Sequence, residues 1–449
     1  MIGVNNIMRK HQSLLFLITL SSITRLISAS SLQSGPMVGY AEMREVPVWV
    51  QTKQAAQVRL YYWPRNNLEK RQSSEIKTTQ RADGFATTLM ATDLFPGTQY
   101  AYSVEVDGAT VALDYPTEFE TLPFFRNRMP PPDFTVALAG ANYVNDAPFD
   151  PLNRKPGGEY TIYNEILAKD PNLMIWVGNT LHLRESDWNT YSGYVSRYTH
   201  ARSVPELQPL LARVHHSAIW SSHDYNRPGA DKHTWNKQDA QRAFATFWPN
   251  PSYGVADLKG TMTTLRWSDV DFFLLDDRSH RDLSYRLDNQ KQILGDEQWK
   301  WLVKMLKRSQ ASFKVIVVGS PVLNPDKSPD NMTSANAERS KLLDALKANE
   351  LGNLLFVSGG KTHGEMTKMV RAGSPDIYEL TLGPLTARPA NDTDELNYFR
   401  VPGTSTFQRH FSTLQFHGPE HNRAVTIRVF DSAGDELWTE TILANDLKF

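Results

Sequence analysis

The chain of 449 residues contains no cysteine. It therefore cannot have a disulfide framework, a zinc–thiolate site or a lipid-modified N-terminal cysteine. It also has almost no excess charge, because 48 Lys and Arg balance 49 Asp and Glu to a formal net charge of −1 at pH 7. A broad basic surface that would recruit nucleic acid or an anionic membrane is therefore not expected.

Long apolar segments are missing as well. No stretch approaches the ~20 uninterrupted apolar residues that a membrane-spanning helix needs, so the mature chain is expected to have no transmembrane anchor. One short apolar run, residues 14–20, follows Arg9-Lys10-His11 and precedes Ser28-Ala29-Ser30. This order is typical of an export signal, so we expect residues 1–30 to be a cleaved signal peptide and the protein to be secreted or periplasmic. A disordered cytoplasmic leader is the alternative.

The first part of the mature chain is rich in β-branched and aromatic residues. Residues 36–124 contain alternating runs at 48–52, 57–62 and 85–89, which predict strands of a small β-sandwich. A turn at Pro96-Gly97 leads into another alternating run, a pattern that resembles the corner of fibronectin type III-like domains. Pro130-Pro131-Pro132 then predicts a stiff extended link, because three fixed φ angles exclude a helix.

Residues 132–449 instead alternate between predicted strands and helices, which predicts a layered α/β domain. Four polar segments each follow directly after a predicted strand, beginning at Gly140, Gly178, Trp220 and Ser358. Because α/β sheets place ligand sites at the carboxyl ends of their strands, these four loops are expected to converge on one pocket. The expected strands are at 133–139, 173–177, 218–220, 270–275, 313–318 and 354–357, the helices at 161–168, 297–309 and 337–348, and a hairpin at 424–430 and 436–443.

Three of these loops are similar to motifs of the PhoD-like alkaline phosphatase D family. Trp220-Ser221-Ser222-His223-Asp224-Tyr225 resembles Trp-Asp-Asp-His-Asp-Tyr. Residues 177–185 resemble the Gly-Asp-x-x-Tyr segment, and residues 357–363 resemble Ser-Gly-Asp-x-His-His. The resemblance extends from about Met37 to Trp438 and implies a metallophosphatase fold, with iron and calcium bound by cysteine, tyrosine, aspartate and histidine.

The chain departs from the family at most of the matched metal-binding positions. Only His223, Asp224 and His363 keep the family's residue type. Loss of several carboxylates removes the negative charge that offsets repulsion between cations, so we do not expect a multinuclear centre. The substituted positions are Ala141 for cysteine, Asn179, Ser221, Ser222 and Gly360 for aspartate, His182 for tyrosine and Thr362 for histidine.

Two interpretations of the remaining side chains stay open. His182, His223, Asp224, His363 and Glu365 could hold a single divalent metal (Zn, Ca or Fe), since two histidines and a carboxylate suffice for a catalytic site. Alternatively, His223 and Asp224 only orient a loop through hydrogen bonds, and no cofactor is bound. A Ser-His-Asp hydrolase using Ser221 or Ser222 is disfavoured, because adjacent residues do not present a nucleophile to its base.

Four arginines in family-like segments, Arg184, Arg197, Arg202 and Arg278, are candidates for an anion-binding cleft, although each could instead form a structural ion pair. The sequence therefore predicts a PhoD-like protein with a degenerate metal centre and no firm catalytic residue beyond the candidates His223, Asp224 and His363. It would be weak or inactive as an enzyme, and would bind a phosphorylated or anionic small molecule or a glycan. The alternative is an active phosphomonoesterase or phosphodiesterase with an altered metal set.

Overall fold

The computed structural model describes residues 31–286, 290–391 and 395–449, so the expected signal peptide lies outside the described residues. The N-terminal part is a β-sandwich. One sheet has the order β1-β2-β6, and the other the order β4-β3-β7-β8, with β5 added to β3 and β9 to β7. Its strands are β1 (Leu32–Val38), β2 (Val46–Thr52), β3 (Gln57–Pro64), β4 (Gln72–Ser73), β5 (Lys77–Thr78), β6 (Ala86–Ala91), β7 (Gln99–Val106), β8 (Ala109–Thr110) and β9 (Glu118–Glu120).

The alternating sequence of this part explains its sandwich. In β3 and β7 every second residue is buried, so each strand turns one face toward the partner sheet. The predicted corner is present as well, because the Tyr100 hydroxyl accepts a hydrogen bond from the Phe95 amide at 2.9 Å. This bond fixes the turn that leads into β7.

The larger part contains two six-stranded sheets, whose inner faces share one apolar core that includes Leu138, Ile175, Val317 and Val357. Within them, β10 to β12 run parallel, as do β14, β15, β16 and β18. The first sheet contains β12 (His215–Ile219), β11 (Leu173–Val177), β10 (Phe134–Ala139), β19 (His410–His417), β20 (Ala424–Asp431) and β21 (Glu436–Leu443) in that order. The second contains β13 (Thr263–Trp267), β14 (Val270–Leu274), β15 (Phe313–Val318), β16 (Leu354–Ser358), β18 (Ile377–Thr381) and β17 (Glu365–Met369).

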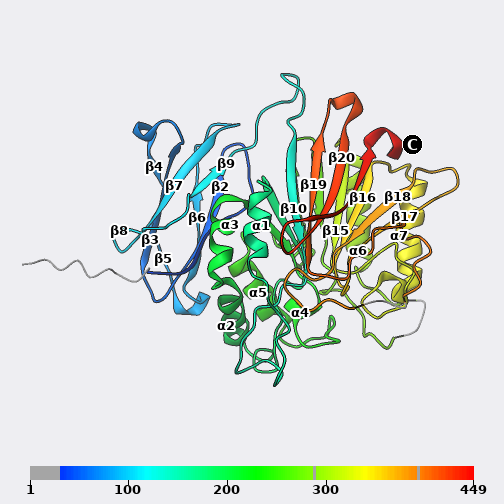
Figure 1. Ribbon diagram of the computed structural model, residues 1–449, viewed down its shortest axis with the longest axis horizontal. Helices are drawn as coiled ribbons and strands as arrows, with labels where there is room; N and C mark the ends of the chain where they lie inside the picture. Colours follow the sequence, from blue (N-terminus) through cyan, green and yellow to red (C-terminus); the bar gives the residue numbers. More distant parts are fainter. Residues whose placement is uncertain (1–30, 287–289, 392–394) are drawn as a thin grey trace, which may run out of the picture.

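Helices cover the outer faces of both sheets, which completes the predicted layered α/β fold (Figure 1). On the side of the N-terminal sandwich lie α1 (Ile162–Ala168), α2 (Tyr191–Arg202), α3 (Gln208–Arg213) and α5 (Lys237–Phe247). On the opposite side, α6 (Asp296–Arg308) and α7 (Asn336–Ala348) pack leucines against Phe273, Ile316 and Phe356 of the second sheet. The short helix α4 (Ser222–Tyr225) lies beyond the carboxyl ends of the strands. Among the described residues, no helix has the length and apolar character needed to cross a membrane.

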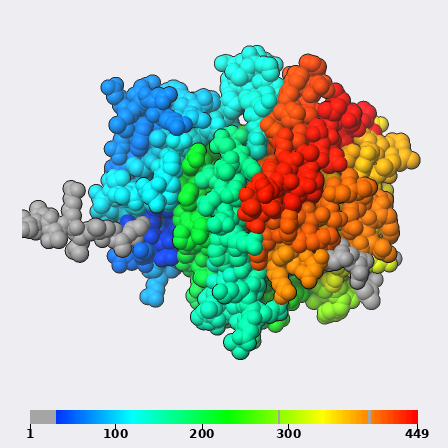
Figure 2. Space-filling view, viewed as in Figure 1, coloured from blue at the N-terminus to red at the C-terminus, as the bar shows by residue number. Residues whose placement is uncertain are grey.

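The N-terminal sandwich and the α/β part share a continuous apolar contact. Met37 and Trp49 of the sandwich belong to the same buried cluster as Tyr198 and Phe247 of the helical layer. The Tyr102 hydroxyl also donates a hydrogen bond to the Ala212 carbonyl across the contact. Figure 2 shows the sandwich in blue and cyan directly against the green helical region.

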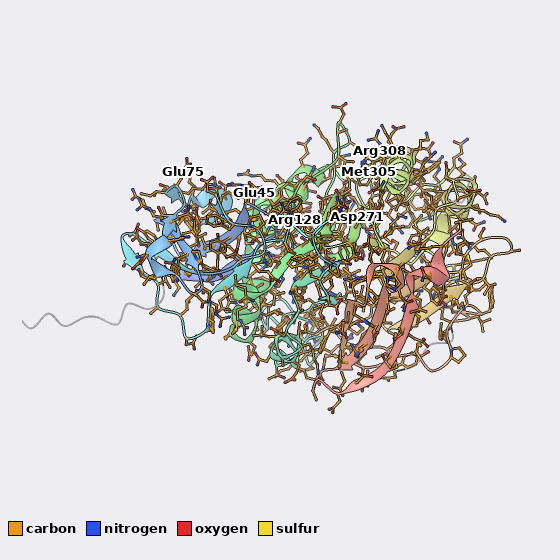
Figure 3. The ribbon with its side chains drawn as sticks, turned by 90° about the horizontal axis from the view of Figure 1, so that it is seen from above. Glu45, Glu75, Arg128, Asp271, Met305 and Arg308 are labelled. Atoms are coloured by element: carbon orange, nitrogen blue, oxygen red, sulfur yellow. The ribbon has the colours of Figure 1, made fainter. Side chains whose placement is uncertain are left out.

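The predicted stiff link between the two parts is held at its end by Arg423, whose side chain is fully buried. Its guanidinium donates to the carbonyls of Pro131 and Pro132, and forms ion pairs with Asp133 at 2.7 Å and Asp269 at 3.1 Å. In the view from above, the link is marked by Arg128, between Glu45 of the sandwich and Asp271 of β14 (Figure 3). One buried cation therefore joins the link to the α/β core.

Candidate functional site at the strand ends

The loops that follow β10, β11 and β12 lie side by side, as expected from the topology. The Ala141 amide donates to the Gly178 carbonyl at 3.2 Å, and the Asn142 amide to the Asn179 carbonyl at 2.7 Å. Ala141 and Asn179 both have φ of +49°, in the left-handed region. The chain therefore turns sharply at the end of each strand, which brings the following side chains to one edge of the sheet.

Glycine at position 178 is required by this close approach. Its φ is +74°, and a Cβ there would lie 2.6 Å from the Cβ of Ser221 on the next loop. Both the positive φ and the short distance to Ser221 make any other residue at this position energetically costly. The contact between the β11 and β12 loops thus depends on the absence of a side chain.

Asp224 is buried, and its carboxylate is used to hold these two loops together. Oδ1 accepts hydrogen bonds from the Thr180 hydroxyl at 2.6 Å and the Leu181 amide at 3.1 Å, while Oδ2 accepts from the Ser221 amide at 2.8 Å. Burial raises the pKa of Asp224 to about 6, although these donors act in the opposite direction. This arrangement supports the interpretation of Asp224 as a residue that orients a loop.

His223 does not bond to Asp224 but stacks on His182. The two rings are 4.2 Å apart between centroids and inclined by only 11°. Burial lowers the pKa of His182, and the neighbouring His223 and Arg184 lower it further. Burial also lowers the pKa of His223, with Asp330 opposing and Arg278 adding to the shift. Both imidazoles are therefore held in the neutral form, and two parallel stacked rings do not point their nitrogens at one common ion.

At the substituted positions Asn179 and Ser221, the side chains form hydrogen bonds within the protein. The Asn179 Oδ1 accepts the His223 amide at 2.9 Å and the Ser222 hydroxyl at 3.5 Å. The Ser221 Oγ accepts a hydrogen bond from Nη2 of Arg278 at 3.3 Å. A guanidinium thus lies beside a hydroxyl at a position where the resemblance implies a metal-binding aspartate.

Arg278 belongs to a buried ion cluster beyond β14. Its guanidinium lies 2.9 Å from Asp330 and 3.3 Å from the fully buried Asp277, and Arg281 lies 3.4 Å from Asp330. Burial raises the pKa of Asp277, whereas Arg278 and Arg281 lower the pKa of Asp330 against the effect of its own burial. The positive charge of Arg278 is therefore largely matched inside the protein.

Two of the four arginines considered for an anion-binding cleft, Arg197 and Arg202, make their contacts within the protein. Arg197 forms buried ion pairs with Asp187 and Asp146. Arg202 lies at the contact with the N-terminal sandwich, where its guanidinium is 3.9 Å from the ring centre of Trp248 and donates to Phe247. Of the four arginines, Arg184 and Arg278 lower the pKa of His223. Arg184 is itself paired with Asp150 at 2.8 Å.

His363 lies in a different polar cluster. Its Nε2 is 3.6 Å from Glu365, whose carboxylate accepts from Arg400 at 2.5 Å and from Asn397 at 2.8 Å. The described part of the chain contains one group of three histidine or acidic ligand atoms within 4.8 Å of one another, namely His363, Glu365 and Glu395. The structure therefore separates His363 and Glu365 from His182, His223 and Asp224, and does not assemble the single five-residue metal site considered from the sequence.

These donors do not fit the metal centre that the family implies. Asp224 is occupied by three hydrogen bonds, and in the only compact trio of the described residues Arg400 pairs with Glu365 and Lys361 with Glu395. His363 and Arg400 lower the pKa of Glu365 to about 2 against the effect of burial, so that carboxylate is already held as an anion by partners within the protein. At Gly360, φ is +78° and a Cβ would lie 2.8 Å from the Gly319 carbonyl, so the backbone itself opposes an aspartate. Thr362 is exposed to solvent.

Sequence reasoning missed the acidic members of the ion cluster. Asp276 and Asp277 precede Arg278 directly, but nothing local distinguishes their roles. In the structure Asp276 accepts from the Trp220 indole at 2.7 Å and Asp277 from the Ser320 hydroxyl at 2.5 Å. Asp330 comes from a loop 52 residues further along the chain. Its contact with Arg278 depends on the fold and has no sequence signal.

Both parts of the chain are similar to known families or solved structures. A family model described as PhoD-like phosphatase matches residues 134–433, and one described as a domain of unknown function (DUF7800) matches residues 29–123. The chain is similar to a solved structure described as PhoD, with 16% identity, a TM-score of 0.75 and coverage of 93% of this chain and 90% of that chain. It is also similar to purple acid phosphatase PPD1 from yellow lupin (Lupinus luteus) seeds, with 13% identity, a TM-score of 0.66 and coverage of 91% and 74%. Identities this low show the fold alone, and no curated protein matches the sequence.

Proposed function

Because the chain belongs to the PhoD-like phosphatase family, we propose that it retains the phosphatase fold but binds an anionic ligand of the phosphate-ester type without hydrolysing it efficiently. The fold supplies the loops at the strand ends, and the residues on those loops decide the chemistry. We further propose that the protein acts outside the cytoplasm, on the basis of the signal-like residues 1–30.

The observation that carries this proposal is the hydrogen bond from Arg278 to Ser221. A metallophosphatase holds cations with anionic oxygen ligands, so that they can bind phosphate and generate a nucleophile. Here a guanidinium contacts a neutral hydroxyl at the matched position, and Asn179 supplies a neutral amide beside it. Neither side chain provides the charge that would offset two neighbouring cations.

An anionic ligand remains the best-supported class because of the family and of the groups near His223. Arg184 and Arg278 both lower the pKa of His223, although each also has an acidic partner, and neutral imidazoles can donate hydrogen bonds to phosphate oxygens. The alternative is an active metal-dependent phosphomonoesterase or phosphodiesterase with an altered metal set. Family membership is the observation that favours it.

The decisive experiment measures turnover of p-nitrophenyl phosphate and bis(p-nitrophenyl) phosphate by the mature chain, with added Zn, Ca or Fe, together with metal content by elemental analysis. We expect substoichiometric metal, negligible turnover, and a melting temperature that chelator does not change, because no metal-binding free energy is linked to folding. Turnover that disappears in His223→Ala but persists in the exposed control His233→Ala would establish the active alternative. A chelator-induced fall in melting temperature that zinc or calcium reverses would show a metal site that the proposal denies.

A further inference from the structure

An open cavity of about 930 Å³ lies next to the strand-end loops. It is bordered by the loop after β14, the loop after β15 and the beginning of α7. Pro329 lines it, and the next residue, Asp330, pairs with Arg278 of the buried ion cluster. The cavity is therefore close to the candidate site but is formed by different residues.

Its lining is basic. Lys291, Lys327 and Arg339 contribute three positive charges, and no Asp or Glu lines it among the described residues. The nearby Asp326 is paired with Lys361 at 2.8 Å, and Glu338 accepts three backbone amides, those of residues 293 to 295. Acidic side chains close to the cavity thus already have partners. The charge that faces the cavity is positive.

Lys291 is the unusual member of this lining, because its side chain is buried with only 4% of the residue exposed. Its ammonium donates one hydrogen bond, to the Ser284 carbonyl at 2.8 Å. In the described part of the chain no carboxylate lies within 4 Å of it, and Asp282 and Asp330 act on it only from further away. Burial and then Arg281 lower the pKa of Lys291, while Asp282 and Asp330 act in the opposite direction. A buried ammonium with no carboxylate within 4 Å among the described residues is costly, and such positions commonly serve a ligand.

The beginning of α7 adds to the positive electrostatic potential of the cavity. Asn336 and Ala337 of α7 line the cavity together with residues 333 to 335 of the 3-10 turn that precedes them, and α7 has 13 residues, long enough for its first turn to carry a partial positive charge. Phe399, Pro325 and Pro329 supply apolar surface on the rest of the lining.

We propose that this cavity binds the phosphate group of a small phosphate monoester, with Lys291 as the buried counter-charge and Lys327 as an exposed second cation. The apolar side chains would contact the organic part of the ester. The proposal rests on the function proposed above and locates the ligand beside the strand-end loops rather than among them.

The test measures binding of p-nitrophenyl phosphate and of inorganic phosphate to the mature chain by titration calorimetry. Lys291→Met should weaken both affinities by at least about 30-fold, because it removes the buried cation that faces the phosphate. Lys327→Ala should weaken them only about threefold, since its ammonium is exposed to solvent. The matched control is Lys300→Met, on the exposed face of α6 and outside the cavity lining, which should leave both affinities unchanged.

A second readout separates ligand binding from simple misfolding. Lys291→Met keeps the aliphatic length and removes a buried charge that has no carboxylate within 4 Å in the described part of the chain, so the ligand-free melting temperature should stay the same or rise. The rise in melting temperature that the ester produces should be lost. A lower ligand-free melting temperature with unchanged affinity would overturn the proposal.

The remaining outcomes distinguish this site from the function proposed above. Ester binding that survives Lys291→Met but is lost in Arg278→Gln would place the ligand at the strand ends and overturn only the cavity. Absence of binding by the wild-type chain would overturn the cavity as a phosphate site. Rapid hydrolysis of the ester would overturn the proposed function itself, independently of Lys291.

Discussion

At the scale of single residues, the strand-end loops show how a retained residue type can take a structural task. Asp224 occupies the position of a family aspartate, yet its carboxylate accepts the Thr180 hydroxyl and two backbone amides. Asn179 likewise accepts the amide of His223. Positions matched by sequence therefore identify where a side chain lies, but its partners decide what it does.

Asp224 should leave a measurable pH signature. Its folded pKa of about 6 lies above the unfolded value near 3.8, so its stabilising contribution is fully present below pH 3.8 and is lost as pH rises through 6. The free energy of unfolding of the wild type minus that of Asp224→Asn should therefore fall by about 2 kcal/mol between pH 4 and pH 7. Urea denaturation at each pH gives this difference, with the exposed Asp170→Asn as control. A difference that rises with pH would contradict the burial-dominated environment.

Gly178 is a second residue whose role is local and testable. Gly178→Ala should destabilise the protein by about 2–4 kcal/mol, since the positive φ disfavours alanine and the new Cβ meets Ser221. Gly373→Ala is the matched control, because its φ is +67° but nothing lies within 4 Å of the added Cβ. The control should lose only about 1–2 kcal/mol. Equal losses in the two variants would mean that the contact with Ser221 costs nothing.

At the scale of elements, regular hydrophobic patterns predicted most strands and two of the longer helices. The expected strand at 313–318 coincides with β15, and the helix expected at 337–348 differs from α7 by one residue. The helices α2 and α5 were missed. In α2 the buried side of the helix includes Arg197 and Arg202, so its polar and apolar residues do not separate into two faces. Long-range ion pairs stabilise that helix, and they have no local sequence signal.

Loop chemistry also belongs to this scale, because several loops must change together to form a metal centre. Asn179→Asp alone should remain inactive, since Ser221, Ser222 and Thr362 stay unchanged and Arg278 still contacts Ser221. Joint replacement of Ala141, Asn179, His182, Ser221, Ser222 and Thr362 by the family residues should at least bind metal tightly. Gly360 is kept as glycine in this design, because an added Cβ approaches the Gly319 carbonyl.

Metal stoichiometry and ester turnover of both variants, measured under the same metal supply, provide the test. Strong turnover by the single variant would mean that the other loops already hold a competent cation. The view of the centre as degenerate would then be wrong.

At the scale of the whole molecule, both the layered α/β fold and the preceding sandwich were predictable, because they follow from hydrophobic patterning. The placement of the arginines was not. Arg202 was expected in a ligand cleft but lies at the contact with the sandwich, between Trp248 and Met37. Residues that face another domain and residues that face a ligand have the same appearance in one sequence. The arrangement of the domains distinguishes them.

His215 connects the two parts and should make their contact sensitive to acid. Its Nδ1 lies 2.7 Å from the Gly39 carbonyl, and its Nε2 accepts a hydrogen bond from the Glu120 amide at 3.2 Å. A second ring proton, on Nε2, would therefore point at the N–H group of Glu120. Burial lowers the pKa of His215 to about 4. The stabilisation is therefore complete above the unfolded pKa near 6.5 and is lost as pH falls toward 4, by up to about 3 kcal/mol.

The unfolding free energy of the wild type relative to His215→Gln should accordingly fall between pH 7 and pH 4. The exposed His233→Gln should show no such trend relative to the wild type. A difference that stays constant with pH would show that burial does not hold His215 in the neutral form.

The buried guanidinium of Arg423 has a consequence for how the protein loses its structure on heating. Arg423 ties Pro131 and Pro132 to the α/β core, and Trp49 of the sandwich belongs to an apolar cluster of the α/β part. The sandwich is therefore not expected to unfold or separate independently of the α/β part. Melting should be a single cooperative event, with one heat-absorption peak whose calorimetric and van 't Hoff enthalpies agree. Arg423→Met should divide that peak in two, with the sandwich separating first. The link would then behave as a hinge instead of a rigid joint.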